Sequence, residues 1–250
     1  MKKGIFIMGA AMKEQETEKL RNCGFTLVEL LIAMVICSFL ITGMVSVQKS
    51  MQTSCTNQEE LSEVQQNIRA SLYIIVRELR MAGFDPTGEA DAAITSADSN
   101  SISFSVDTRG AAFNSDPDED TNDPNESITY SLFDCDGDGD LDLRRQDPTV
   151  VPVNALVPVE QMVAENVAAL DFVYLDEDES VMATPVAGSD FEDIKSVQLT
   201  IVISSDRDDK GYYNDNVYVN QQGNTVFGPA NDSFRRRALT TNIFCRNLGA

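Results

Sequence analysis

The sequence contains no histidine and no tryptophan, and only 5 of its 250 residues are cysteine. Without histidine there is no imidazole for a zinc site or for a histidine-based catalytic triad. No two cysteines have the C-x-x-C spacing of a redox or zinc motif, and no segment has the pattern of a phosphate-binding loop. These absences argue against catalysis, and we expect a protein that is not an enzyme.

Basic residues are also scarce. The 19 lysines and arginines face 40 aspartates and glutamates, which gives a formal net charge of −21. Such a surface repels nucleic acid and anionic lipid headgroups, so the charge favours a cation or a basic partner.

One long apolar run organises the chain. Residues 24–47 read GFTLVELLIAMVICSFLITGMVSV and carry a single charge, Glu29. From Phe25 to Val47 there are 23 residues, which span roughly 34 Å as a helix, against a hydrocarbon core of about 30 Å. The run is long enough to cross a membrane.

The flanks of this run predict its orientation. Residues 1–24 are weakly basic, whereas the chain after the run is strongly acidic. The positive-inside rule then keeps the N-terminus in the cytoplasm and sends the remainder of the chain across the membrane. Met8 and Met12 leave the true start of the leader open.

The junction of leader and apolar run, CGFTLVE, resembles the type III signal of type IV pilin-like proteins. The resemblance implies that a prepilin peptidase cleaves between Gly24 and Phe25 and methylates the new N-terminal Phe25. The apolar helix then stays on the mature subunit, in contrast to a secretory signal peptide. An ordinary signal anchor with an incidental glycine is the alternative.

Glu29 lies inside the apolar run, where a carboxylate costs roughly 2.5 to 3.5 kcal/mol and therefore needs a partner. In pilins that partner is the N-terminal ammonium of a neighbouring subunit, here on Phe25, so the resemblance makes Glu29 an assembly residue. The alternatives are that Glu29 reaches the membrane interface or offsets the helix dipole.

The pattern beyond the apolar run predicts one continuous helix over residues 25–82, with its transmembrane half over 25–47. An apolar stripe recurs every three or four residues, and Gly83 and Pro86 end it. Its members are Leu61, Val64, Ile68, Leu72, Ile75, Leu79 and Ala82.

Residues 83–250 alternate apolar and polar side chains in several short segments, which predicts an antiparallel sheet packed on the amphipathic half of the helix. The fold class is therefore α+β. The expected strands contain Ile102 to Val106, Ile128 to Leu132, Leu141 and Leu143, Phe172 and Tyr174, Val197 to Ile203, and Leu239 to Ile243.

An acidic turn, DCDGDGDLD, has the oxygen spacing of a calcium loop, with a glycine at the sixth position. Its carboxylates are Asp134, Asp136, Asp138, Asp140 and Asp142. The twelfth position is Arg145 instead of a bidentate glutamate, so we expect a calcium site weaker than an EF-hand. A merely acidic hairpin turn is the alternative.

Two further features are weaker signals. Cys135 and Cys245 are the two cysteines in the globular part, and export would permit a disulfide between them. Arg235, Arg236 and Arg237 form a basic cluster that either docks an acidic neighbour or is simply solvated.

Several segments together resemble the PilW family of minor pilins. They are RELRMAG at 77–83, the hairpin ITYSLFDCDGDGDLDLRRQ, the segment VAENVAALDFVYLD and the ending FRRRALTTNIFCRNLGA. The resemblance implies a low-abundance subunit that primes or caps a type IV pilus, first in the inner membrane and then on the cell surface. Its partners would be major and minor pilins, the prepilin peptidase and the assembly platform. A J-type minor pseudopilin of type II secretion, or a tip adhesin with calcium-ordered loops, are the alternatives.

Overall fold

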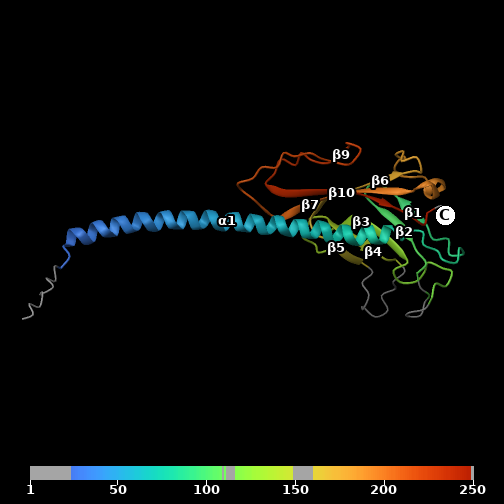
Figure 1. The fold of residues 1–250 in the computed structure, drawn as a ribbon, viewed down its shortest axis with the longest axis horizontal. Coiled ribbons are helices and arrows are strands. Elements are labelled where there is room, and N and C mark those ends of the chain that lie inside the picture. Colours follow the sequence, from blue (N-terminus) through green and yellow to red (C-terminus); the bar gives the residue numbers. More distant parts are fainter. Residues whose placement is uncertain (1–23, 109, 111–115, 149–159, 249–250) are drawn as a thin grey trace, which may run out of the picture. The chain divides into compact units, whose positions relative to one another are not determined.

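Helix α1, Leu27–Leu79, is the longest element of the chain, with 53 residues. The computed structural model describes residues 24–108, 110, 116–148 and 160–248 (Figure 1). The predicted helix over 25–82 is confirmed, with slightly shorter bounds. The chain divides within this helix into two units, Met1–Gln52 and Thr53–Ala250, each of which is described by itself.

In the first unit, every side chain from 27 to 52 is exposed. This stretch makes α1 the one described helix that is long and apolar enough to cross a membrane, with a mean hydropathy of 2.5 over its most apolar window. Ser38, Thr42 and Ser46 donate their hydroxyl hydrogens to carbonyls three or four residues earlier. Because these hydroxyls are satisfied by their own helix, they add little cost in an apolar environment.

The described residues of the second unit contain ten strands, all in antiparallel pairs. Five form a sheet in sequence order, namely β1 Ile94–Ala97, β2 Ile102–Ser105, β3 Ser127–Phe133, β4 Asp142–Gln146 and β5 Glu160–Ala164. Three form a second sheet in the order β10 Phe234–Phe244, β7 Ser196–Asp208 and β6 Val167–Leu175. A small ribbon pairs β8 Tyr218–Val219 with β9 Thr225–Phe227.

The predicted strands are present, but the structure divides them between two sheets instead of one. Strands β1, β5, β8 and β9 were not predicted, because they are short or lack alternation. Strand β5, for example, reads EQMVA. A 3-10 helix, Gly188–Asp193, lies between β6 and β7.

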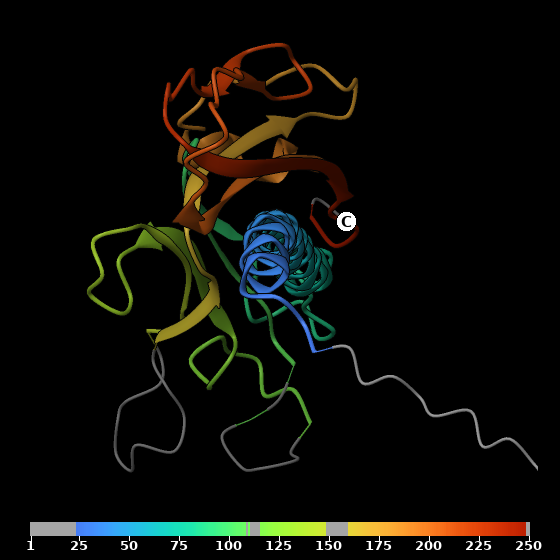
Figure 2. The same ribbon diagram turned by 90° about the vertical axis from the view of Figure 1, so that its left-hand side faces the viewer.

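The second half of α1 packs on both sheets (Figure 2). Its buried side chains are Val64, Ile68, Ser71, Leu72, Ile75 and Leu79, which confirms the predicted stripe except for the half-buried Leu61. The apolar members of this set join one core with Phe104 and Tyr130 of the five-stranded sheet and with Leu199 and Ile201 of the three-stranded sheet. Each fully buried leucine or isoleucine contributes about 1.5 to 3 kcal/mol, so this stripe fixes the helix on the sheets.

The helix leads into a tight turn at Gly83, which has a φ of +75°. Its backbone N–H donates to the Ser105 carbonyl at 3.0 Å. A Cβ at this position would lie 2.6 Å from Leu248 Cδ2. A shift of the flexible Leu248 side chain relieves this contact, so it is the left-handed φ that requires glycine here, and the predicted stop at Gly83 is confirmed.

A polar cluster lies beneath the last turns of α1. Glu78 Oε2 accepts hydrogen bonds from the Tyr130 hydroxyl at 2.6 Å and from Arg145 Nε at 2.9 Å. Burial, together with the Glu78 charge, raises the pKa of Tyr130. Burial alone would lower the pKa of Arg145, but the Glu78 carboxylate raises it above its ordinary value. The cluster ties α1 to β3 and β4.

Breaking this cluster should destabilise the fold, because Glu78→Ala leaves the Arg145 guanidinium without its partner. The Arg145 side chain is only 6% exposed. We expect the free energy of unfolding to fall by about 3 to 5 kcal/mol. Urea unfolding of the full chain in detergent, followed by circular dichroism, measures the change. Glu59→Ala, on the exposed face of the same helix, is the control and should change stability by less than about 0.5 kcal/mol. Equal effects of the two substitutions would contradict this role.

Candidate functional site

The start of α1 is stabilised by three reciprocal hydrogen bonds between Thr26 and Glu29. Glu29 Oε2 accepts from the Thr26 backbone N–H at 2.9 Å and from its hydroxyl at 3.0 Å. In return, the Glu29 backbone N–H donates to Thr26 Oγ1 at 3.3 Å. This is a capping box, with Thr26 at the N-cap and Glu29 at the third helical position. Glu29 therefore stabilises its own helix start in the single chain.

The capping role was not predicted, although the T-x-x-E pattern before an apolar run is its usual signal. The sequence-based interpretation considered only the charge of Glu29. The structure shows that this carboxylate is also held in a defined position, at the first turn of the apolar helix.

The cleavage junction precedes this cap and is open. Phe25 is 89% exposed, and a Cβ built on Gly24 would meet no atom within 4 Å. Packing within the described part of the chain therefore does not require glycine at position 24. The leader residues 1–23 lie outside the described part of the protein.

The apolar surface that follows has no cover among the described residues. Its exposed large side chains are Leu27, Val28, Leu30, Leu31, Ile32, Met34, Val35, Ile36, Phe39, Leu40, Ile41, Met44, Val45, Val47 and Met51. A patch of this size marks a surface for lipid or for other protein chains. The site that the sequence predicted at Gly24, Phe25 and Glu29 thus lies at the head of an uncovered apolar helix.

The acidic hairpin between β3 and β4 is the second candidate. Asp134 accepts backbone hydrogen bonds from Gly137 at 2.7 Å and Gly139 at 3.2 Å. Carboxylate oxygens of Asp134, Asp136 and Asp138 lie within 4.8 Å of one another. Three of the predicted calcium ligands are therefore brought together, and oxygen donors at this spacing suit a calcium ion.

Two residues of the predicted loop have other roles in the structure. Asp142 is buried and accepts backbone hydrogen bonds from Cys135 at 3.0 Å and Asn166 at 3.1 Å. Arg145, at the twelfth loop position, pairs with Glu78. Asp140 is exposed at the tip, and its N–H donates to Asp138.

Export would permit a disulfide between Cys135 and Cys245, but the structure has both as free cysteines, which corrects this possible pairing. Cys135 lies on the acidic hairpin, whereas Cys245 is buried in the core after β10. Burial raises the pKa of Cys245 to about 12, so its thiol stays protonated at neutral pH. Burial and the Asp142 charge raise the pKa of Cys135 as well.

Two of the three arginines in the cluster 235–237 form ion pairs within the chain. Arg235 pairs with Asp209 at 2.7 Å, and Arg236 forms two hydrogen bonds of 2.7 Å with Asp232. These bonds from the arginines lower the pKa of both aspartates. Arg237 is exposed. The cluster is therefore neither simply solvated nor free as a whole to dock a neighbour.

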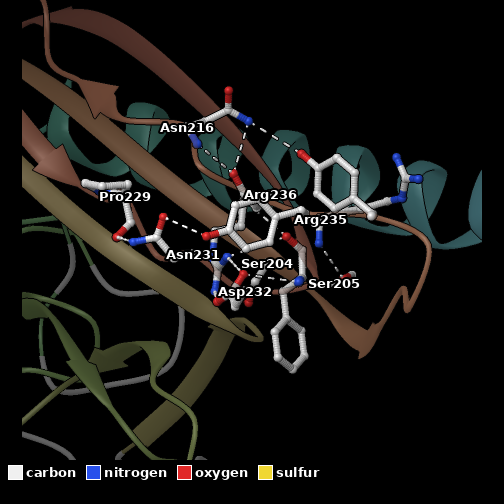
Figure 3. A network of polar contacts seen from close by, with 12 residues as sticks. Ser204, Ser205, Asn216, Pro229, Asn231, Asp232, Arg235 and Arg236 are labelled. Atoms are coloured by element: carbon white, nitrogen blue, oxygen red, sulfur yellow. Dashed lines mark hydrogen bonds and ion pairs between the residues drawn. The ribbon is translucent and has the colours of Figure 1, made fainter.

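Figure 3 shows the network around these arginines. Asn231 accepts from the Tyr213 hydroxyl and donates to the Pro229 carbonyl, and Asn216 donates to the Tyr212 hydroxyl. The network fastens the long segment between β7 and β10. Sequence reasoning missed it because the partners are up to 30 residues apart.

Comparison with known proteins gives one family match. The family described as "Prokaryotic N-terminal methylation motif" matches residues 19–45. No curated protein matches the chain. Among solved structures, a type IV-like pilin from Thermus thermophilus is similar over 74% of this chain and 98% of its own, with 13% identity and a TM-score of 0.45. The chain thus carries a prepilin-type methylation motif, which contains Gly24, Phe25 and Glu29.

Calcium binding at the acidic hairpin remains a prediction. If the dissociation constant is about 1 mM, 10 mM calcium should stabilise the full chain by about 1.4 kcal/mol. Thermal unfolding and titration calorimetry in detergent measure this. Asp136→Asn with Asp138→Asn should abolish the effect, whereas the matched pair Glu177→Gln with Asp178→Asn, on another exposed acidic turn, should not. No calcium-dependent heat or shift at this concentration rules the site out.

Proposed function

We propose that this chain is a minor pilin of the PilW kind, a subunit without catalytic activity that primes or caps a type IV pilus. The methylation motif over residues 19–45 is the observation that carries the proposal. It coincides with an exposed apolar helix that begins at Leu27 and has an acid in its first turn. A soluble monomer could not leave that surface in water.

In this proposal the apolar half of α1 first lies in the inner membrane, with the N-terminus in the cytoplasm and the globular unit in the periplasm. Prepilin peptidase cleaves between Gly24 and Phe25 and methylates Phe25. The assembly platform then moves the helix from lipid into a bundle with other major and minor pilins. Both environments are apolar, so the exposed side chains of α1 remain covered throughout.

In this proposal Glu29 sets the position of the helix relative to its neighbours in the bundle. After cleavage, Phe25 has a new ammonium group, and a neighbouring subunit's ammonium is a cation that can pair with Glu29. In an apolar bundle such a pair is favourable only when the two charges meet closely. The capping box supports this role, because it fixes the carboxylate before a neighbour arrives.

Two alternatives share these features. A J-type minor pseudopilin would act in type II secretion, and a tip adhesin would use its exposed acidic loops to contact a ligand. Deletion of the gene separates the three. Loss of pili supports the assembly role, loss of secretion supports the pseudopilin, and loss of adhesion with intact pili supports the adhesin.

Two substitutions separate the charge of Glu29 from its capping role. Glu29→Leu removes both, whereas Glu29→Gln keeps a side chain that can complete the capping box. We expect both variants to insert into the membrane and to be processed, and both to be lost from sheared filaments by at least about tenfold. Immunoblots of membrane and filament fractions measure this, with Glu59→Gln as the control. Normal incorporation of Glu29→Gln would contradict the charge role.

A further inference from the structure

A groove of about 490 Å³ runs along the globular unit between the second half of α1 and strand β10. Its apolar lining includes Leu72, Val76 and Leu239. Strand β10 is at the edge of its sheet. Three arginines of α1 also line the groove, namely Arg69, Arg77 and Arg80.

These arginines are available for a partner. All three are exposed, and within the described residues neither Arg69 nor Arg80 forms an ion pair. Arg77 lies 4.0 Å from Glu78, whose carboxylate is already held by Arg145. No acid lines the groove among the described residues.

The three positive charges of the groove are unusual in a chain with a net charge of −21. The helix dipole favours cations near the helix C-terminus, which accounts for Arg77 and Arg80. It does not account for Arg69, which lies ten residues before the helix ends at Leu79. Nor does it account for the apolar lining beside them.

The composition of the groove is that of a protein interface. Tyr73 is 70% exposed and Met81 is 38% exposed, and both lie beside the arginines. Tyrosine, methionine and arginine are enriched in interface centres, where an apolar surface and a planar cation bind together. The partner that fits must combine exposed carboxylates with apolar contacts.

The acidic hairpin of the same unit has these properties. Asp136, Asp138 and Asp140 are exposed at its tip. Phe133 and Leu141, on either side of the tip, are 46% and 47% exposed. The carboxylates of Asp134, Asp136 and Asp138 repel one another at their short separation, and guanidinium groups would relieve that repulsion.

We propose that the groove of one chain binds the acidic hairpin of a second copy. The aspartates would pair with Arg69, Arg77 and Arg80, and the apolar residues beside the tip would contact the groove lining. The groove and the hairpin are different surfaces, so the contact is heterologous and each copy can bind a further one. Its use in a filament rests on the proposed function, but the contact itself does not.

Charge exchange tests the contact in the full chain in detergent with a calcium chelator present, because calcium and the arginines would compete for the same aspartates. The groove variant is Arg69→Glu, Arg77→Glu and Arg80→Glu, and the hairpin variant is Asp136→Lys, Asp138→Lys and Asp140→Lys. We expect the wild type to self-associate at roughly 0.1 mM in sedimentation experiments, and each variant alone to associate at least about tenfold more weakly. A mixture of the two variants should associate again, because opposite charges then meet.

The matched control changes Arg207, Lys210 and Arg246 to glutamate, which alters the net charge equally at exposed sites outside the groove. It should associate like the wild type, at an ionic strength of about 0.15 M where long-range repulsion is screened. Thermal unfolding verifies that every variant is folded. A monomeric wild type, association that survives the groove substitutions, or a mixture that stays monomeric overturns the proposal. Failure here leaves processing and the Glu29 result unchanged, so the two proposals fail separately.

Discussion

The uncovered apolar surface of α1 is the constraint on which the rest of the molecule depends. From Leu27 to Met51 the large apolar side chains have no partner within the described chain. Their transfer out of water is worth on the order of 25 cal/mol for each Å² of apolar surface, so this surface must be covered by lipid or by other helices. A helix of this kind cannot be the end state of a free soluble protein.

In the globular unit, the same helix packs against its own chain. There a narrow stripe from Val64 to Leu79 faces both sheets, and the ion pair between the half-buried Glu78 and the buried Arg145 joins the helix to β4. The Gly83 turn then returns the chain to the sheet at Ser105. One continuous sequence thus encodes a surface for partners and a surface for its own core.

Sequence reasoning predicted what depends on local periodicity. The helix, its buried stripe, the stop at Gly83 and most of the long strands follow from the spacing of apolar residues. The division into two sheets could not be predicted, because it depends on which strands pair over long distances. The roles of Glu78 and Arg145 were missed for the same reason, since their bond joins residues 67 positions apart. The possible disulfide does not form, because the fold places Cys135 on the acidic hairpin and Cys245 in the core, and sequence spacing cannot show whether two cysteines meet.

The contacts of the charged residues also could not be predicted from sequence spacing alone. The pattern placed Asp134, Asp136 and Asp138 together correctly, yet Asp142 accepts backbone hydrogen bonds from Cys135 and Asn166. The arginine cluster looked like one feature in the sequence, whereas the structure commits Arg235 and Arg236 to internal pairs. Pairing in space decides which charges remain for partners.

The central claim is that the apolar helix stays on the mature protein, begins at a processed Phe25 and is covered by other subunits. Mass spectrometry of the N-terminal peptide, from protein in sheared filaments of its own host, tests this most directly. The account predicts a peptide that begins at Phe25 and carries one methyl group on its amine. A filament-bound chain that still contains its leader, or a processed chain that lacks the apolar helix, would contradict it.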